Sequence, residues 1–222
     1  MKLEILYEDN HCLAVSKPAG VLVQGDRTGD ATLVDAAAAY LRQRYDKPGR
    51  VYVGIVHRLD RPVSGVVLLA RTSKAAARLS EQFRERRVRK LYRAVLEHPL
   101  EEDEGALEHF LRKDPLTNRT HIVDPEEAGA RRARLRYRVL HRDKRGTSVE
   151  VEPLTGRSHQ IRVQMAAIGS VIVGDVRYGS KRELGNWIAL HAFEIEFKHP
   201  TRDERVSVCV EPPAAWAGLL DP

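Results

Sequence analysis

Residues 134–139 have the sequence Arg-Leu-Arg-Tyr-Arg-Val, in which charged and apolar side chains alternate. A period of two is the repeat of a β-strand, because successive side chains of a strand point to opposite faces. The segment therefore predicts a half-exposed strand whose outer face is lined with arginine. The same alternation recurs at residues 193–197 and 206–210, and it is typical of antiparallel sheets with one face on the core.

Further strands and three helices are expected around these segments. Residues 66–70 are continuously apolar, as in a buried strand, and short apolar runs at 5–7 and 12–15 flank a turn-like Glu-Asp-Asn. Apolar stripes predict three helices, capped by Thr32, Ser73 and Ser158. Loops are predicted from Gly, Pro, Asp and Asn content at 25–31, 46–50, 97–105, 112–130 and 179–186. Strands outnumber helices without alternating strictly with them. This pattern favours an α+β fold with a mixed, largely antiparallel sheet and flanking helices.

The composition is that of a globular protein. The chain has 222 residues, 42% of them hydrophobic, and its 37 Lys and Arg against 31 Asp and Glu give a net charge of +6. Disorder and collagen-like repeats are thereby excluded. Two cysteines far apart argue against a secreted, disulfide-stapled chain, and no apolar run approaches the roughly 20 residues of a membrane span. We expect a reduced, soluble, cytoplasmic protein that does not contact a membrane.

Charge is unevenly distributed along the chain. Residues 71–93 hold nine Lys and Arg against two acids, and residues 131–145 hold eight against one. Between them, residues 97–108 hold six acids and no Lys or Arg. The blocks suggest a bipolar surface whose basic part grips a phosphate backbone. The alternative for each block is an ordinary solvated face.

Two short segments carry the residue types that chemistry needs. Residues 57–65, His-Arg-Leu-Asp-Arg-Pro-Val-Ser-Gly, lie between two apolar runs, where a loop can hold catalytic groups on a rigid sheet. Residues 154–162, Leu-Thr-Gly-Arg-Ser-His-Gln-Ile-Arg, contain a turn at which a helix begins near two arginines, an arrangement suited to an anion. The simpler alternatives are a surface turn with a local ion pair for the first and an amphipathic helix with solvated arginines for the second.

Sequence motifs for cofactors are missing. The chain has neither a phosphate-binding Walker loop nor a G-x-G-x-x-G sequence, and its nine histidines include no H-x-x-x-H pair. We therefore expect no nucleotide cofactor and no metal.

Taken together, the motifs resemble those of the RluA-type RNA pseudouridine synthases. The matching segments run in family order through Tyr7–Asp9, Ser16–Val21, His57–Gly65, Lys90–Ala94, Leu154–Val163, Gly174–Gly179, Leu190–Ala192 and His199–Pro200. The sequence departs from the common pattern at Val63, where many members carry Thr, and at Gln164, where many carry His.

The resemblance implies the pseudouridine synthase fold with a central cleft, and the isomerisation of uridine to pseudouridine within structured RNA, ribosomal or transfer. It implies Asp60, Tyr92 and Arg162 as catalytic residues. By the same resemblance, RNA contacts are expected from Arg58, Lys90, Arg157 and Gln160. Whether Asp60 attacks C1′, adds to the base or starts an elimination is left open by the sequence, as are the identity of the RNA and of the uridine.

The resemblance also bears on domain organisation. We expect residues 1–222 to form a single catalytic domain, acting as a monomer, without the separate N-terminal RNA-binding domain that many members carry. One alternative function is a catalytically silent RNA-binding or RNA-chaperone protein on the same fold, against which the presence of Asp60, Tyr92 and Arg162 argues. A sequence-tolerant DNA-binding protein using residues 73–93 is a second alternative, which leaves the motifs around Asp60 and Arg162 without a role.

Overall fold

A computed structural model describes residues 1–26, 28–46 and 48–219. The chain forms two compact units, which differ in their helices and strands. The first unit comprises Met1–Lys90 and Ala192–Pro212, and the second comprises Leu91–His191 together with residues 213–219. Each unit has its own buried core of apolar side chains. The described part of the chain contains no helix long and apolar enough to cross a membrane.

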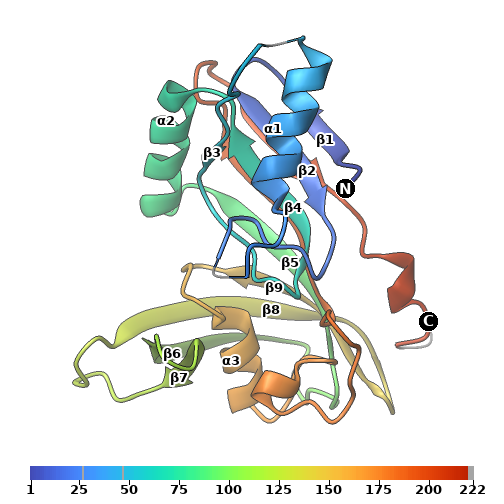
Figure 1. The fold of residues 1–222 in the computed structure, drawn as a ribbon. Helices are drawn as coiled ribbons and strands as arrows, with labels where there is room; N and C mark the ends of the chain where they lie inside the picture. The colour runs from blue at the N-terminus through green and yellow to red at the C-terminus, as the bar shows by residue number, and fades with distance from the viewer. Residues whose placement is uncertain (27, 47, 220–222) are drawn as a thin grey trace. The chain divides into compact units, whose positions relative to one another are not determined.

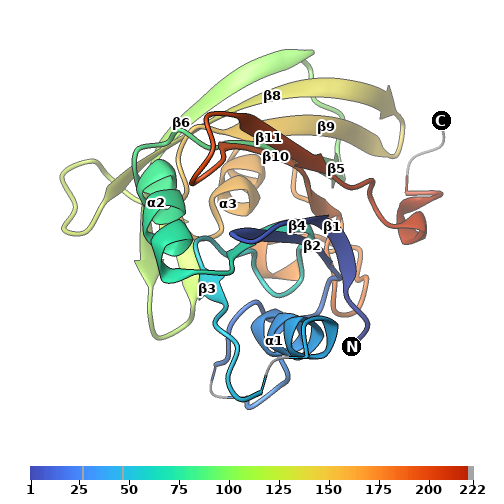
Figure 2. The same ribbon diagram turned by 90° about the horizontal axis from the view of Figure 1, so that it is seen from above.

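Paired strands and two helices make up the first unit. Strands follow one another in space as β1 (Glu4–Glu8), β2 (Cys12–Lys17), β4 (Ser64–Ala70), β10 (Leu190–Lys198) and β11 (Arg205–Cys209), and the short β3 (Gly54–Ile55) also pairs with β4. The helices are α1 (Leu33–Arg44) and α2 (Ser73–Arg84), which lie at different sides of β2 and β4 (Figure 2).

Strand β4 is buried on both faces, and one of these faces packs against α2. All seven residues of β4 are buried, and alternate ones, Val66, Leu68 and Ala70, pack with Ala75 and Leu79 of α2. The continuous apolar run is therefore the signature of a strand covered on both faces, as the sequence predicts. Thr32 caps α1 through a capping box with Asp35, also as predicted.

Antiparallel strands and one helix packed against them form the second unit (Figure 1). Its strands follow the order β5 (Arg89–Leu96), β9 (Gly146–Pro153), β8 (Arg131–Asp143), β6 (Glu104–Asp114) and β7 (Arg119–Ile122). Helix α3 (Gln160–Ala167) and the 3-10 turn η1 (Val176–Tyr178) pack over β6 and β8, and a second 3-10 turn, η2, spans Ala214–Trp216. The predicted arginine-lined strand is β8.

Two loop predictions and two caps differ from the structure. The predicted loops at 97–105 and 112–130 contain the ends of β6 and the whole of β7, because charged residues there pair across strands instead of facing a turn. Helix α2 is capped by Thr72 and not by Ser73, and α3 begins after His159 and not after Ser158. His159 has φ of 51°, a left-handed conformation unusual for a residue with a side chain.

Candidate active site

Asp60 lies on a tight turn between β3 and β4. Its carbonyl accepts a hydrogen bond from the Val63 amide at 3.1 Å, and its neighbour Leu59 is buried and anchors the turn. Gly65, the second residue of β4, has φ of +120°, and a Cβ there would lie 2.3 Å from the Ala192 carbonyl oxygen. Only glycine fits there, so the last residue of the 57–65 motif is explained by packing. Asp60 itself is half-buried.

The buried side chain of Lys17 holds this turn in place through hydrogen bonds. Its side chain is fully buried at 1% exposure, and its ammonium donates to the carbonyls of Pro18, Val21 and Arg61 at 2.8–3.1 Å. Burial lowers the pKa of Lys17 to about 7, while the negative charge of Asp60 acts to raise it. The Ser16–Val21 segment thus serves as a clamp on the turn that carries Asp60, a role that the sequence analysis did not assign to it.

His57 fixes the other end of the turn. Its Nε2 accepts a hydrogen bond from the Leu68 amide at 2.9 Å, and its ring stacks on Phe83 of α2 with centroids 4.7 Å apart. Burial, with the nearby charge of Lys90, lowers the pKa of His57 to about 3. The imidazole is therefore neutral near pH 7, and its accepting nitrogen is already occupied. These features suit a structural anchor for the motif better than an acid or a base.

The two other candidates of the first unit differ in exposure. Arg58 is exposed beside Asp60, and its Nη1 lies 3.4 Å from the Gln24 side-chain oxygen. Its guanidinium can therefore reach solvent or a nucleic acid base. Lys90 is only half-exposed, and burial lowers its pKa. Because Lys90 is less accessible than Arg58, it is the lesser candidate for a phosphate contact.

In the second unit, the 154–162 motif forms a tight turn ahead of α3. Gln160 is buried, and its side-chain oxygen accepts from the Thr155 hydroxyl at 2.7 Å and the Arg157 amide at 3.0 Å. Its amide nitrogen donates to the carbonyl of Arg134 in β8. Gln160 thus organises the turn from within, and Arg157, which is half-exposed, is the better placed of the two for an RNA contact.

Arg162 has a carboxylate partner that the sequence analysis missed. Its Nε and Nη2 donate to the two carboxylate oxygens of Asp175 at 2.7 and 2.8 Å, and both side chains are buried. The signal was present in the Gly174–Gly179 segment, which matched the family pattern without an assigned role. Tyr92 lies on β5 opposite Val151 of β9 and is half-buried.

The predicted residues thus fall into two groups. Arg58, Asp60 and Lys90 belong to the first unit, whereas Tyr92, Arg157, Gln160 and Arg162 belong to the second.

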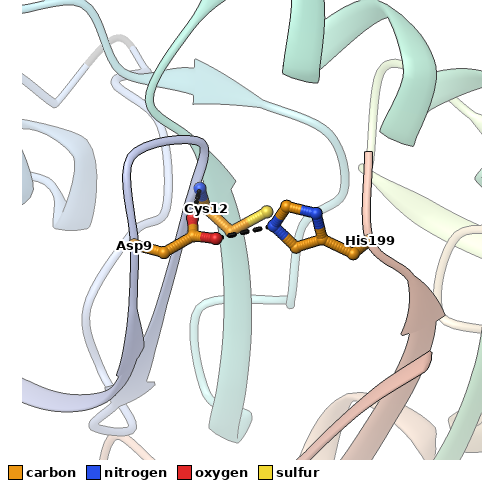
Figure 3. A group of neighbouring side chains, drawn as sticks. All are labelled: Asp9, Cys12 and His199. Carbon is orange, nitrogen blue, oxygen red and sulfur yellow. Dashed lines mark hydrogen bonds and ion pairs between the residues drawn. The ribbon is translucent and has the colours of Figure 1, made fainter. Parts of the chain in front are cut away.

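One group in the first unit has the composition of a metal site. Asp9, Cys12 and His199 place a carboxylate, a thiol and an imidazole within 4.8 Å of one another (Figure 3). His199 Nδ1 accepts from the Arg202 amide at 3.0 Å, so the proton lies on Nε2, which contacts Asp9 at 2.6 Å.

The remaining groups of this cluster also favour an internal hydrogen-bond network. Burial raises the pKa of the Cys12 thiol to about 12, and Arg202 contributes a cation to the Asp9 carboxylate at 2.9 Å. A metal would require the thiolate and an unprotonated Nε2. We therefore interpret the cluster as a junction between the β1–β2 turn and the β10–β11 turn.

Neighbouring acids neutralise part of the charge of both basic blocks. Strands β6 and β9 flank β8, and their glutamates face its arginines across the sheet. Glu108 binds Arg132 through both oxygens at 2.7 and 2.8 Å, and Glu150 binds Arg138 at 3.1 Å. The expectation of a bipolar surface is therefore wrong for this pair of segments, because antiparallel pairing places the acidic 97–108 run beside the basic 131–145 run.

The 71–93 block is also partly paired, since Arg71 binds Glu8 and Arg93 binds Glu150. At the end of α2, Arg87 pairs with Glu85, whereas Arg84 and Arg86 form no ion pair with the described residues. Both are exposed. The end of α2, with Arg84 and Arg86, is therefore a candidate for a phosphate contact.

Comparison with known proteins agrees with these motifs. Residues 11–167 match the family model described as RNA pseudouridylate synthase. The chain is 33% identical to ribosomal large subunit pseudouridine synthase D of Zymomonas mobilis, over 95% of this chain and 69% of that protein. It is 34% identical to ribosomal large subunit pseudouridine synthase C of Haemophilus influenzae, over 90% of this chain and 62% of that protein.

The fold has a close counterpart among solved structures. Human RNA pseudouridylate synthase domain containing 4 superimposes with a TM-score of 0.82 at 22% identity, covering 97% of this chain and 91% of that one. The predicted α+β pseudouridine synthase fold is thereby confirmed. With a family match over residues 11–167 and relatives of one-third identity along most of its length, the chain belongs to the RNA pseudouridine synthases, a family of isomerases, and its motifs are those of the RluA type.

Proposed function

We propose that this protein converts one or more uridines of a structured RNA, ribosomal RNA first, into pseudouridine, with Asp60 as the catalytic carboxylate. The observation that carries the proposal is the setting of Asp60. It is a half-buried carboxylate on a turn clamped by Lys17 and anchored by His57, within the segment that matches the family. Such a turn holds a reactive group in a fixed place.

The reaction fits a site built from side chains. The N1–C1′ bond of uridine breaks, the uracil turns, C5 joins C1′, and the C5 proton is lost while N1 regains one. No atom is gained overall, so the isomerisation consumes neither oxidant nor energy source. An ionised carboxylate can attack an electron-poor carbon or stabilise a cationic sugar. Attack at C1′, addition to the base and elimination at C2′ all begin from ionised Asp60.

Arg162 and Tyr92 are proposed to assist in different ways. A guanidinium near a carboxylate favours its ionised form, and Arg162 is the cation that the family motif supplies. Tyr92 offers a flat ring on which uracil can stack and a phenol oxygen that can take part in moving the C5 proton. Because phenol has a pKa of about 10, a role as base would require the site to lower that pKa.

The target uridine must leave the RNA stack before it can react. Extrusion of a base costs a few kcal/mol, which a side chain filling the vacated place can offset. Arg58 is proposed for that place because it is exposed and adjoins Asp60. Lys90, Arg157 and Gln160 are proposed as secondary RNA contacts, of which Arg157 is the most accessible.

Ribosomal RNA is favoured because two relatives are named ribosomal large subunit pseudouridine synthases. Transfer RNA is the other candidate. The test is release of tritium from RNA labelled at C5 of uridine, with purified large-subunit RNA and bulk transfer RNA as separate substrates. Release from either supports the reaction and chooses the substrate. RNA from cells lacking the gene should also lose specific pseudouridines, and no release with no lost pseudouridine contradicts the proposal.

A further inference from the structure

The Arg162–Asp175 ion pair is almost completely buried. The Arg162 and Asp175 side chains are 5% and 1% exposed. Those of Arg132 and Glu108, which also form a bidentate pair, are 55% and 45% exposed. Burying two charges costs several kcal/mol per ion unless geometry and hydrogen bonding compensate. Apolar side chains of similar size often stabilise a fold as well as a buried ion pair does. Stability alone therefore does not explain why this pair is buried at α3, the helix that carries Arg162.

The backbone around Asp175 restrains the position of its carboxylate. Gly174 has φ of +86°, and a Cβ there would lie 2.9 Å from a methyl carbon of Leu184, so glycine is required. The Asp175 amide donates to the Ile172 carbonyl at 3.0 Å, and its own carbonyl accepts from Tyr178 at 2.9 Å and Ser180 at 3.1 Å. With its backbone held on both sides, Asp175 has little freedom to move its side chain away from Arg162.

Tyr178 confines the same guanidinium from another direction. Its ring centroid lies 5.1 Å from Cζ of Arg162, within the range of a cation–π contact. The ring is itself fixed, since its hydroxyl accepts from the Thr120 amide at 2.9 Å and lies 2.8 Å from Nδ1 of His159. The position and the plane of the Arg162 guanidinium are therefore set by groups that do not move independently.

We propose that Asp175 is the positioning residue for Arg162 in the pseudouridine synthase reaction. By holding the edge formed by Nε and Nη2, Asp175 fixes the plane of the Arg162 guanidinium and hence the direction in which its N–H groups donate. The pair is neutral overall, so Arg162 acts through directed N–H donors more than through net charge. This role rests on the proposed function, in which Arg162 is part of the active site.

The decisive experiment is a double-mutant cycle on the single-turnover rate of tritium release at saturating RNA. Asp175→Asn keeps the shape and one hydrogen-bond acceptor but loses the charge, and we expect the rate to fall at least about tenfold while RNA affinity changes less than about threefold. Asp175→Glu, which restores the carboxylate, should recover part of the rate. In an Arg162→Lys background the bidentate contact is already lost, so adding Asp175→Asn should lower the rate by a further factor of less than about two.

The control is Glu108→Gln, which breaks an exposed pair of the same geometry and should leave the rate unchanged. Circular dichroism and thermal melting show that each variant is folded; if Asp175→Asn does not fold, the Asp175→Glu and Arg162→Lys arms carry the cycle. Equal losses from the Asp175 change in both Arg162 backgrounds would overturn the positioning role, as would full activity of a folded Asp175→Asn protein. Absence of release by the wild-type protein on any RNA would instead refute the proposed function, and this role with it.

Discussion

At the scale of single residues, the most informative side chain outside the chemistry is Lys17. Its folded-state pKa of about 7 lies below the roughly 10.4 of an exposed lysine, because it is buried. Between these two values the unfolded chain binds more protons than the folded one, so Lys17 makes stability rise with pH from about 7 to about 10. Lys17→Met should remove this contribution, measurable as a flatter dependence of the urea midpoint on pH.

The matched control for Lys17 is Lys198→Met, which removes a lysine whose side chain is 54% exposed and paired with Asp203. That change should leave the slope of stability against pH over the same window close to that of the wild type. If Lys17→Met also leaves the slope unchanged, the Lys17 ammonium stays charged throughout the window, and its three carbonyl partners outweigh burial.

At the level of single residues, the sequence offers candidates where a family motif carries them but not where burial decides a contact. Asp60 and Arg162 are candidates through the resemblance of their motifs to the family, and their catalytic roles stay predictions. The roles of Lys17 and Asp175 were not found, because each depends on a partner distant along the chain: the Arg61 carbonyl for Lys17 and the Arg162 guanidinium for Asp175. Sequence spacing does not show such contacts.

At the scale of secondary-structure elements, the two basic blocks should behave differently toward RNA. Changing Arg84, Arg86 and Arg87 at the end of α2 to Ala should weaken RNA binding. If all three touch phosphates, the slope of log affinity against log salt should also fall in magnitude by about two units, since each neutralised phosphate of a single strand contributes about 0.7. The catalytic rate at saturating RNA should persist. Filter binding between low and moderate salt measures the slope.

The comparison set for α2 is Arg134, Arg136 and Arg138 of β8, which face glutamates of β6 and β9 across the sheet. Their replacement with Ala should change the salt slope less, because glutamates offset their charge. A slope that responds to the β8 set and not to the α2 set would place the RNA-binding surface on β8 and reduce the α2 block to a solvated face.

Element prediction from sequence depended on whether periodicity or composition was used. Period-two alternation located β8, β10 and β11, and continuous apolarity located β4. The sequence predicts loops at the ends of β6 and at β7, because acids, Pro and Asn there resemble turn composition. Their charges are satisfied by neighbouring strands, an arrangement that a single stretch of sequence does not reveal.

For the whole molecule, activity should not require a metal. The donor group Asp9, Cys12 and His199 is committed to internal hydrogen bonds, with the thiol pKa raised and the imidazole proton on Nε2. Tritium release should therefore survive dialysis against EDTA, followed by assay in buffer containing magnesium to keep the RNA folded. Activity that is lost on dialysis and returns only with zinc would show that a metal site exists and that this interpretation of the cluster is wrong.

The central claim for the whole molecule is that it is an isomerase acting through the carboxylate of Asp60. Its most direct test is the rate of tritium release from C5-labelled RNA by Asp60→Asn, a nearly isosteric change that removes the charge and the nucleophilic oxygen. Asp30→Asn, in an exposed ion pair with Arg61, is the control. We predict that Asp60→Asn binds RNA as the wild type does and releases no tritium, whereas the control remains active. A rate for Asp60→Asn within tenfold of wild type, about 1.4 kcal/mol in barrier, would contradict the claim.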